Sequence, residues 1–82
     1  MKKFYADIVR AGRVAYLAGP FDSEPAAREW SQKAWEEACK VDPRAHFDPY
    51  GVVGVTLADG IAFPPGKLNS HLGLDLHHHG VN

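Results

Sequence analysis

The stretch FYADIVRAGRVAYLA, residues 4–18, predicts that the chain begins with a β-hairpin. Residues 4–9 and 13–18 are rich in aromatic and branched side chains, which favour strands. The link between them, Arg10-Ala11-Gly12, ends in glycine, and such a three-residue link is typical of a type I turn followed by a glycine bulge. The two segments are therefore expected to pair as antiparallel strands.

The length of this link sets the register and places Val9 opposite Arg13. One face of the hairpin then carries Phe4, Ala6, Ile8, Val14, Tyr16 and Ala18. The other face carries Tyr5, Asp7, Val9, Arg13, Ala15 and Leu17. The first face is apolar apart from one phenol, so we expect it to face the core.

A helix is expected after the hairpin. Gly19-Pro20 ends the second strand, and Asp22 and Ser23 are both candidate N-caps ahead of Pro25. The helix is expected to run to about Cys39 or Lys40. Its apolar stripe, with a period of 3.6 residues, consists of Ala27, Trp30, Ala34, Ala38 and Val41. Pro43 disfavours helical geometry at the residue before it and ends the helix.

Two further strands are predicted at residues 52–58 and 61–63, joined by the strong hairpin turn Asp59-Gly60. The fold class is therefore α+β with the order ββαββ: an antiparallel four-stranded sheet with one main helix packed on one face. Residues 67–72 are expected to form a short helical turn closed by glycine. Residues 1–74 are interpreted as a single small domain, and residues 75–82 as a flexible, histidine-containing C-terminal tail.

One helix can cover only one face of such a sheet, and the opposite face is also apolar. The candidate interface residues on this face and on the flank of the helix are Tyr5, Val9, Leu17, Trp35, Ile61 and Phe63. An exposed patch of this kind usually marks a contact surface. Three candidates could cover this face: the segment of the chain that carries Leu68, Leu72 and Leu74, a second copy of the chain, or a foreign protein. Trp35 either packs within the chain or anchors a partner.

No catalytic, cofactor-binding or metal-binding residue is assigned. His46 and Asp48 could form a base with its orienting carboxylate, but the Asp-Pro pair favours a turn. The run His77-His78-His79 offers imidazoles without the rigidity that a metal site requires, and it could be native or a purification tag. Cys39 lies near the end of the helix, where the dipole disfavours a thiolate. The protein is therefore expected not to be an enzyme.

Composition limits the classes of partner. The 82 residues carry a net charge of −1, with 45% hydrophobic and 23% charged residues, as in an ordinary folded domain. There is no apolar run of about 20 residues for a membrane span, and the single cysteine suits the cytoplasm. An alternative function is single-stranded nucleic-acid binding through the basic residues of the first hairpin, Lys2, Lys3, Arg10 and Arg13.

Short motifs along residues 4–74 resemble a group of small, uncharacterised proteins of tailed bacteriophages and prophages. They are the run VAYLAGPF at residues 14–21, an alanine-rich helix carrying Arg28, the run VDPRAHFD at 41–48, Tyr50-Gly51, and an ending made of PPGKLN at 64–69 and Leu72-Gly73. The resemblance implies an accessory protein in the cytoplasm of a bacterial host cell, and it carries over no catalytic residue. The predicted function is a non-enzymatic module that binds a host or phage protein, and possibly itself as a homodimer, with no cofactor.

Overall fold

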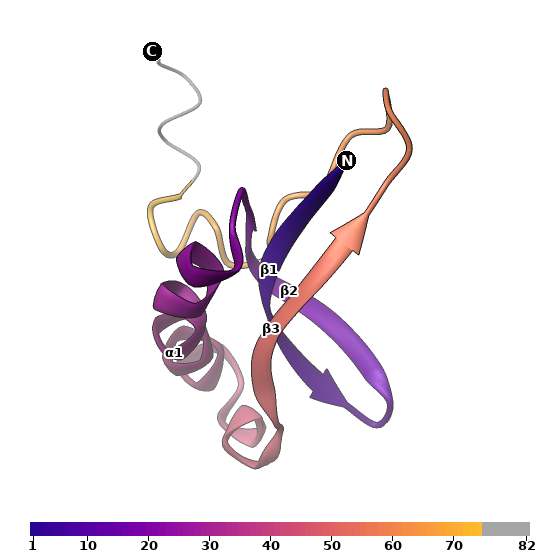
Figure 1. Cartoon of the computed structure of the whole chain (residues 1–82). Helices are drawn as coiled ribbons and strands as arrows, with labels where there is room; N and C mark the ends of the chain where they lie inside the picture. Colours follow the sequence, from indigo (N-terminus) through magenta and orange to yellow (C-terminus); the bar gives the residue numbers. More distant parts are fainter. Residues whose placement is uncertain (75–82) are drawn as a thin grey trace.

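The computed structural model describes residues 1–74 as an antiparallel sheet with one long helix against one face (Figure 1). The strands are β1 (Lys2–Arg10), β2 (Arg13–Phe21) and β3 (Tyr50–Thr56), in the order β2-β1-β3. The helix α1 (Glu24–Val41) is followed by a 3-10 helix, η1 (Pro43–Phe47). The α+β class and the single main helix on the sheet are confirmed. The predicted tail, residues 75–82 with His77, His78 and His79, lies outside the described residues.

The turn between β1 and β2 is one residue shorter than predicted. Arg10 pairs with Arg13, so the loop consists of Ala11 and Gly12, whose φ angles are 52° and 76°. Positive φ at both positions is the signature of a type I′ turn, whose twist suits a two-residue hairpin. The predicted pairing of Val9 with Arg13 is therefore wrong, because Ala11 adopts the left-handed conformation and Arg10 joins the ladder.

A β-bulge at Leu17 then changes the faces of β2. Asp7 pairs with Tyr16 whereas Ala6 pairs with Ala18, so Leu17 is an extra residue on β2. Leu17 packs with Ala6 in the core beside α1, although the sequence places it on the opposite face. On that opposite face, the rings of Tyr5 and Tyr16 stack with their centroids 4.5 Å apart.

Strand β2 continues through Gly19-Pro20 to Phe21, beyond its predicted end, because Phe21 pairs with Phe4. Gly19 has a φ of 130°, and a Cβ atom there would lie 2.9 Å from Cδ2 of Tyr5. The glycine therefore lets the Tyr5 ring pack directly on the backbone of β2, and Tyr5 is completely buried.

Helix α1 begins at the predicted cap and presents small residues to the sheet. The Ser23 hydroxyl accepts a hydrogen bond from the Ala26 amide at 3.3 Å, so Ser23 rather than Asp22 is the N-cap. The buried residues of the helix are Ala27, Ala34, Ala38 and Cys39. Val41, predicted to join this stripe, is the last residue of α1 and is 59% exposed.

The predicted fourth strand, Ile61 to Phe63, is not seen within residues 1–74. The Asp59-Gly60 turn does form, and the Ile61 amide donates to the Ala58 carbonyl at 3.1 Å. The chain then leaves β3 and passes behind the sheet (Figure 1). Two consecutive prolines lack the amide donors of a ladder, and the Pro64 carbonyl accepts a hydrogen bond from the Tyr5 hydroxyl instead.

The segment after these prolines closes the outer edge of β2. The amides of Gly66, Lys67 and Leu68 donate to the carbonyls of Gly19, Tyr16 and Leu17, at 3.0, 2.8 and 2.8 Å. The buried Asn69 side chain adds a two-way amide bridge to the backbone of Gly19. Leu68, Leu72 and Leu74 thereby join the core on the α1 side of the sheet, not the opposite face.

Candidate functional site

A groove of about 450 Å³ lies between the β1–β2 hairpin, the end of α1 and η1. Its apolar floor consists of Ile8, Ala15, Leu17, Ala38, Ala45 and Leu68. Val14 on the hairpin and Val41 on α1 line it from two sides and are 52% and 59% exposed. A volume of this size falls in the range of about 300–1,000 Å³ that ligand sites occupy.

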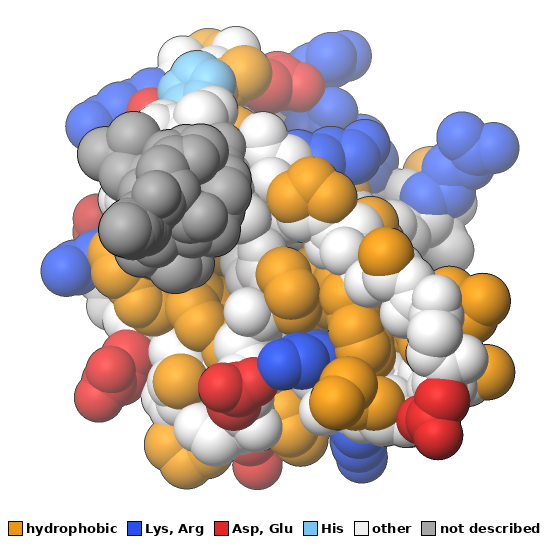
Figure 2. Space-filling view, turned by 90° about the horizontal axis from the view of Figure 1, so that it is seen from above, with side chains coloured by type: hydrophobic (Ala, Val, Ile, Leu, Met, Phe, Trp, Pro, Cys, Tyr) orange, Lys and Arg blue, Asp and Glu red, His pale blue; other side chains and the backbone are white. Residues whose placement is uncertain are grey.

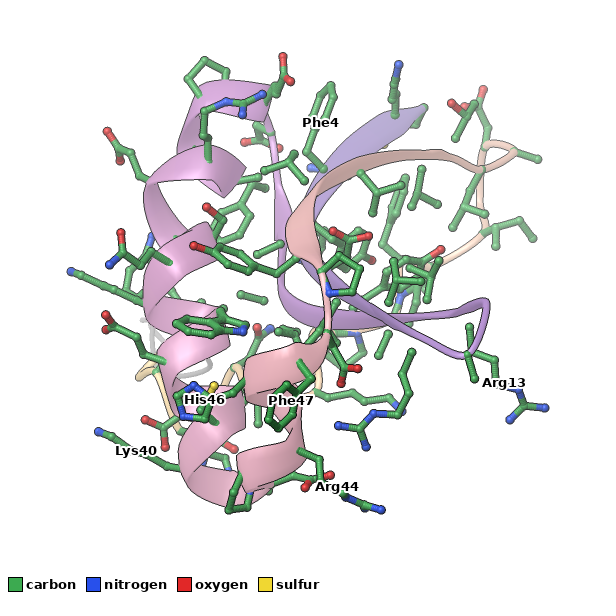
Figure 3. The ribbon with its side chains drawn as sticks, turned by 90° about the horizontal axis from the view of Figure 1, so that it is seen from below. Phe4, Arg13, Lys40, Arg44, His46 and Phe47 are labelled. Carbon is green, nitrogen blue, oxygen red and sulfur yellow. The ribbon has the colours of Figure 1, made fainter. Side chains whose placement is uncertain are left out.

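The groove is lined by the hairpin on one side and by the end of α1 and η1 on the other. In Figure 3, Arg13 lies at the tip of the hairpin, whereas Arg44 and Phe47 lie on η1. Arg13 is exposed because the two-residue turn places it at the start of β2. Ala38 is the alanine of α1 that lines the groove, and its short side chain leaves the floor open.

Four charged side chains form one ion-pair network across the end of the groove. The Arg10 guanidinium contacts Asp42 at 2.9 Å and Asp48 at 2.6 Å. Arg44 binds the same Asp42 carboxylate through Nε at 3.1 Å. Hydrogen bonds from Arg44 and Arg10 hold the pKa of Asp42 well below its usual range. Since Asp42 and Asp48 flank η1, Arg10 fixes both ends of η1 to the end of β1. We call these four residues the latch.

Two cations at the groove remain outside the latch. Arg13 and Lys67 both line the groove, both are exposed, and neither forms a salt bridge within residues 1–74. The two carboxylates that also line it, Asp42 and Asp48, are already paired with Arg10. An incoming anionic group would therefore meet Arg13 and Lys67, while an apolar group would meet the floor.

Trp35 holds η1 against α1 from the other side. Its indole Nε1 donates to the Ala45 carbonyl at 3.0 Å, and its ring stacks on Tyr50 with centroids 5.0 Å apart. The ring of His46 lies edge-on to Trp35 at 5.3 Å. Of the two readings of Trp35, packing within the chain is the one that these contacts show. The neighbouring Phe47, by contrast, is 88% exposed (Figure 3).

The structure separates the other candidate interface residues. Tyr5 and Leu17 are buried on opposite faces of the sheet, at 0% and 5% exposure. Val9 and Phe63 are half-buried, and only Ile61 is well exposed, at 58%. The expected continuous apolar face is therefore absent from the described part of the chain, because the bulge moves Leu17 and the residues around Pro64 cover Tyr5.

The four basic residues of the hairpin lie at its two ends. Lys2 and Lys3 begin β1, whereas Arg10 and Arg13 flank the turn. Lys3 is paired with Asp22, and Arg10 belongs to the latch. A nine-residue strand spans about 30 Å, so these residues do not line one continuous basic groove.

His46 and Asp48 do not come together as a dyad. His46 is exposed beside Trp35, while the Asp48 carboxylate is bound by Arg10. Burial raises the pKa of the Cys39 thiol, and the carboxylates of Glu36 and Asp48 raise it further. Among the described residues, no group of three or more His, Cys, Asp or Glu side chains is placed to hold a metal ion.

Sequence reasoning missed the groove because it placed Val14 and Val41 in the core. The loop gave no signal for the true register, because Ala11 adopts a positive φ that alanine disfavours, and this places Val14 opposite Val9. The part of the chain described here contains no helix with the length and hydropathy to cross a membrane. Comparison with family models, curated proteins and solved structures finds no match to this chain.

Proposed function

We propose that this protein is a small non-enzymatic module that binds a segment of another protein in the groove between the hairpin and η1. The partner segment presents apolar side chains to the floor and a carboxylate to Arg13 and Lys67. The observation that carries the proposal is the open apolar floor beside two cations that lack an acidic partner within residues 1–74.

The shape of the groove favours a peptide segment over a flat protein surface. Apolar anchors at a spacing of one helical turn are a common way to fill a groove between secondary-structure elements. Val14 and Val41 would contact such anchors from two sides, and exposed valines at this position gain apolar contact when the groove is filled. The partner is a host or phage protein if the chain acts in the phage or prophage setting that its motifs resemble, in the bacterial cytoplasm.

The test uses two synthetic amphipathic peptides with the same leucine spacing, one ending in glutamates and one ending in lysines. We expect the glutamate peptide to bind and to shift the backbone NMR signals of Val14, Ala15 and Ala45, which all line the groove. Arg13→Glu and Lys67→Glu should each weaken its binding about five- to tenfold, because each replaces an attraction by a repulsion.

Lys40→Glu is the matched control, since it makes the same change of charge on an exposed side chain outside the groove. It should leave the affinity within about twofold, because separated surface charges are screened by salt. Equal binding of the two peptides, or an equal effect of Lys40→Glu and Arg13→Glu, would refute the proposal.

A further inference from the structure

The two outer edges of the sheet differ in how they are protected. The edge of β2 is closed by hydrogen bonds from Gly66, Lys67 and Leu68. Strand β3 forms the other edge and pairs only with β1 among the described residues. An open edge presents a row of backbone donors and acceptors that can pair with another strand.

Strand β3 itself contains no charged residue, proline or bulge of the kind that usually prevents such pairing. Its sequence, YGVVGVT, contains no charged residue and no proline over seven residues. Natural edge strands are commonly protected by lysines, prolines, bulges or a covering segment. The register of β3 on β1 is also continuous from Tyr50 to Thr56, without a bulge that would turn the edge away.

The sequence of β3 is complementary to itself about Val53. When two copies pair antiparallel with Val53 opposite Val53, Gly51 lies opposite Val55 of the second copy, and Val52 lies opposite Gly54. Each glycine therefore faces a valine, and Tyr50 faces Thr56. Apart from the Val53 pair at the axis, this arrangement opposes no two valines, and it opposes no like charges.

The ends of β3 support the same arrangement. Tyr50 and the neighbouring Phe47, at one end, are 43% and 88% exposed. Beyond the other end, Ile61 is 58% exposed, and Met1, whose carbonyl accepts from the Leu57 amide, is 70% exposed. Figure 2 views the molecule from the side of this second end, and hydrophobic side chains are exposed on that side. With a two-fold axis at Val53, the Tyr50 end of β3 in each copy lies beside the Thr56 end of β3 in the other copy.

We propose that the partner of this edge is a second copy of the chain, joined through antiparallel pairing of β3 with β3 about Val53. The pairing makes one continuous sheet across the two copies. The pairing involves no residue that lines the groove. Dimerisation can therefore be absent while peptide binding in the groove holds, and peptide binding can be absent while dimerisation holds.

Disulfide trapping in solution tests the register directly. In a Cys39→Ala background, which removes the one native thiol, Val53→Cys should cross-link spontaneously between copies. Opposed Cβ atoms in such a pair lie about 5 Å apart, close to what a disulfide needs. Val55→Cys is the matched control, because its two copies would lie about 13 Å apart along the strands. We expect the Val53→Cys protein to cross-link at least about tenfold faster, given that difference in separation.

Sedimentation of the wild-type protein from micromolar to millimolar concentration gives an independent readout. A monomer–dimer equilibrium is expected, and Val53→Lys should weaken it about tenfold or more, because two like charges then oppose each other at the axis. Circular dichroism checks that this variant keeps its fold. Arg13→Glu should leave the equilibrium unchanged. A monomer throughout this range, or equal cross-linking at Val53→Cys and Val55→Cys, overturns the proposal.

Discussion

The Arg10 guanidinium lies 2.6 Å from the Asp48 carboxylate and joins the end of β1 to the residue that follows η1. Thirty-eight residues separate the two in the sequence. The same guanidinium reaches Asp42, the residue that caps both α1 and η1. One side chain therefore sets the distance between the hairpin and η1, which are the two sides of the groove.

Replacing Arg10 by methionine should loosen the groove before it unfolds the domain. The substitution keeps an apolar side chain of similar length but leaves Asp48, whose side chain is only 14% exposed, without its partner. We expect a lower urea midpoint and at least about fivefold weaker binding of the glutamate peptide, because the groove is no longer held in one geometry. Arg44→Met is the control: it also loses a contact to Asp42 but leaves η1 attached to β1, so its effect on binding should be small.

The latch should also give the stability of the protein a specific pH dependence. Arg44 and Arg10 lower the pKa of Asp42 in the folded state, whereas an unfolded aspartate titrates near about 4. Ionised Asp42 therefore stabilises the fold at pH values above about 4, and this contribution is lost as the pH falls below that value. Asp42→Asn should be less stable than the wild type at neutral pH, and the difference in urea midpoint should shrink on acidification.

Asp7 provides a contrast of opposite sign. Burial raises its pKa, although backbone hydrogen bonds at Asp7 and Gly51 act in the other direction. Ionised Asp7 therefore costs stability at neutral pH, and protonation removes that cost as the pH falls. Asp7→Asn should be at least as stable as the wild type at neutral pH. A loss of stability for Asp7→Asn equal to that for Asp42→Asn would show that the charges are not responsible.

Trp35 should matter to stability more than its position on the flank of α1 suggests. Trp35→Phe keeps a ring to stack on Tyr50 but loses the hydrogen bond to the Ala45 carbonyl, at a cost of about 1 kcal/mol in the free energy of unfolding. Trp35→Ala also loses the packing of the ring and should cost about 3 kcal/mol. Urea unfolding measures both. Trp30→Phe is the control, because the Trp30 indole donates no hydrogen bond within the described residues. A cost for Trp30→Phe as large as for Trp35→Phe would argue against the hydrogen bond.

The parts of the fold that depend on local rules could be predicted from the sequence. The hairpin, an N-cap at Asp22 or Ser23, the alanine stripe of α1 and its end before Pro43 each follow from neighbouring residues. The register of the hairpin could not, because it depends on whether Ala11 accepts a positive φ, and propensity alone favours a longer loop. The resulting one-residue shift in register places Val14 outside the core.

The groove and the fate of residues 61–69 depend on competition between distant partners. Ile61 to Phe63 have strand-forming side chains, but the segment that follows them gains three backbone hydrogen bonds and the Asn69 bridge on the edge of β2. Likewise, the sequence predicts the end of α1 before Pro43 and a turn at Asp48-Pro49, but Asp42 and Asp48 find their shared partner in Arg10, far away in the sequence. Such pairings cannot be deduced from local patterns.

Gly66 is the position at which this competition can be tested. A Cβ atom there would lie 2.6 Å from Cα and 2.7 Å from N of Ala18, and the backbone of β2 cannot move aside easily. Gly66→Ala should therefore push the segment off the edge of β2 and cost about 1–3 kcal/mol in the free energy of unfolding, the usual range for overpacking. Hydrogen exchange should show faster exchange at the amides of Lys67 and Leu68, which donate to β2.

Gly51→Ala is the matched control for this last substitution. Its Cβ would meet the Asp7 carboxylate at 3.9 Å, an ordinary contact, and its φ is not in the left-handed region. The two variants add the same methyl group, so the difference between them isolates the clash with β2. Unchanged exchange at Lys67 and Leu68 in Gly66→Ala would contradict the close packing of this segment on β2, and with it the reason that β3 is the open edge.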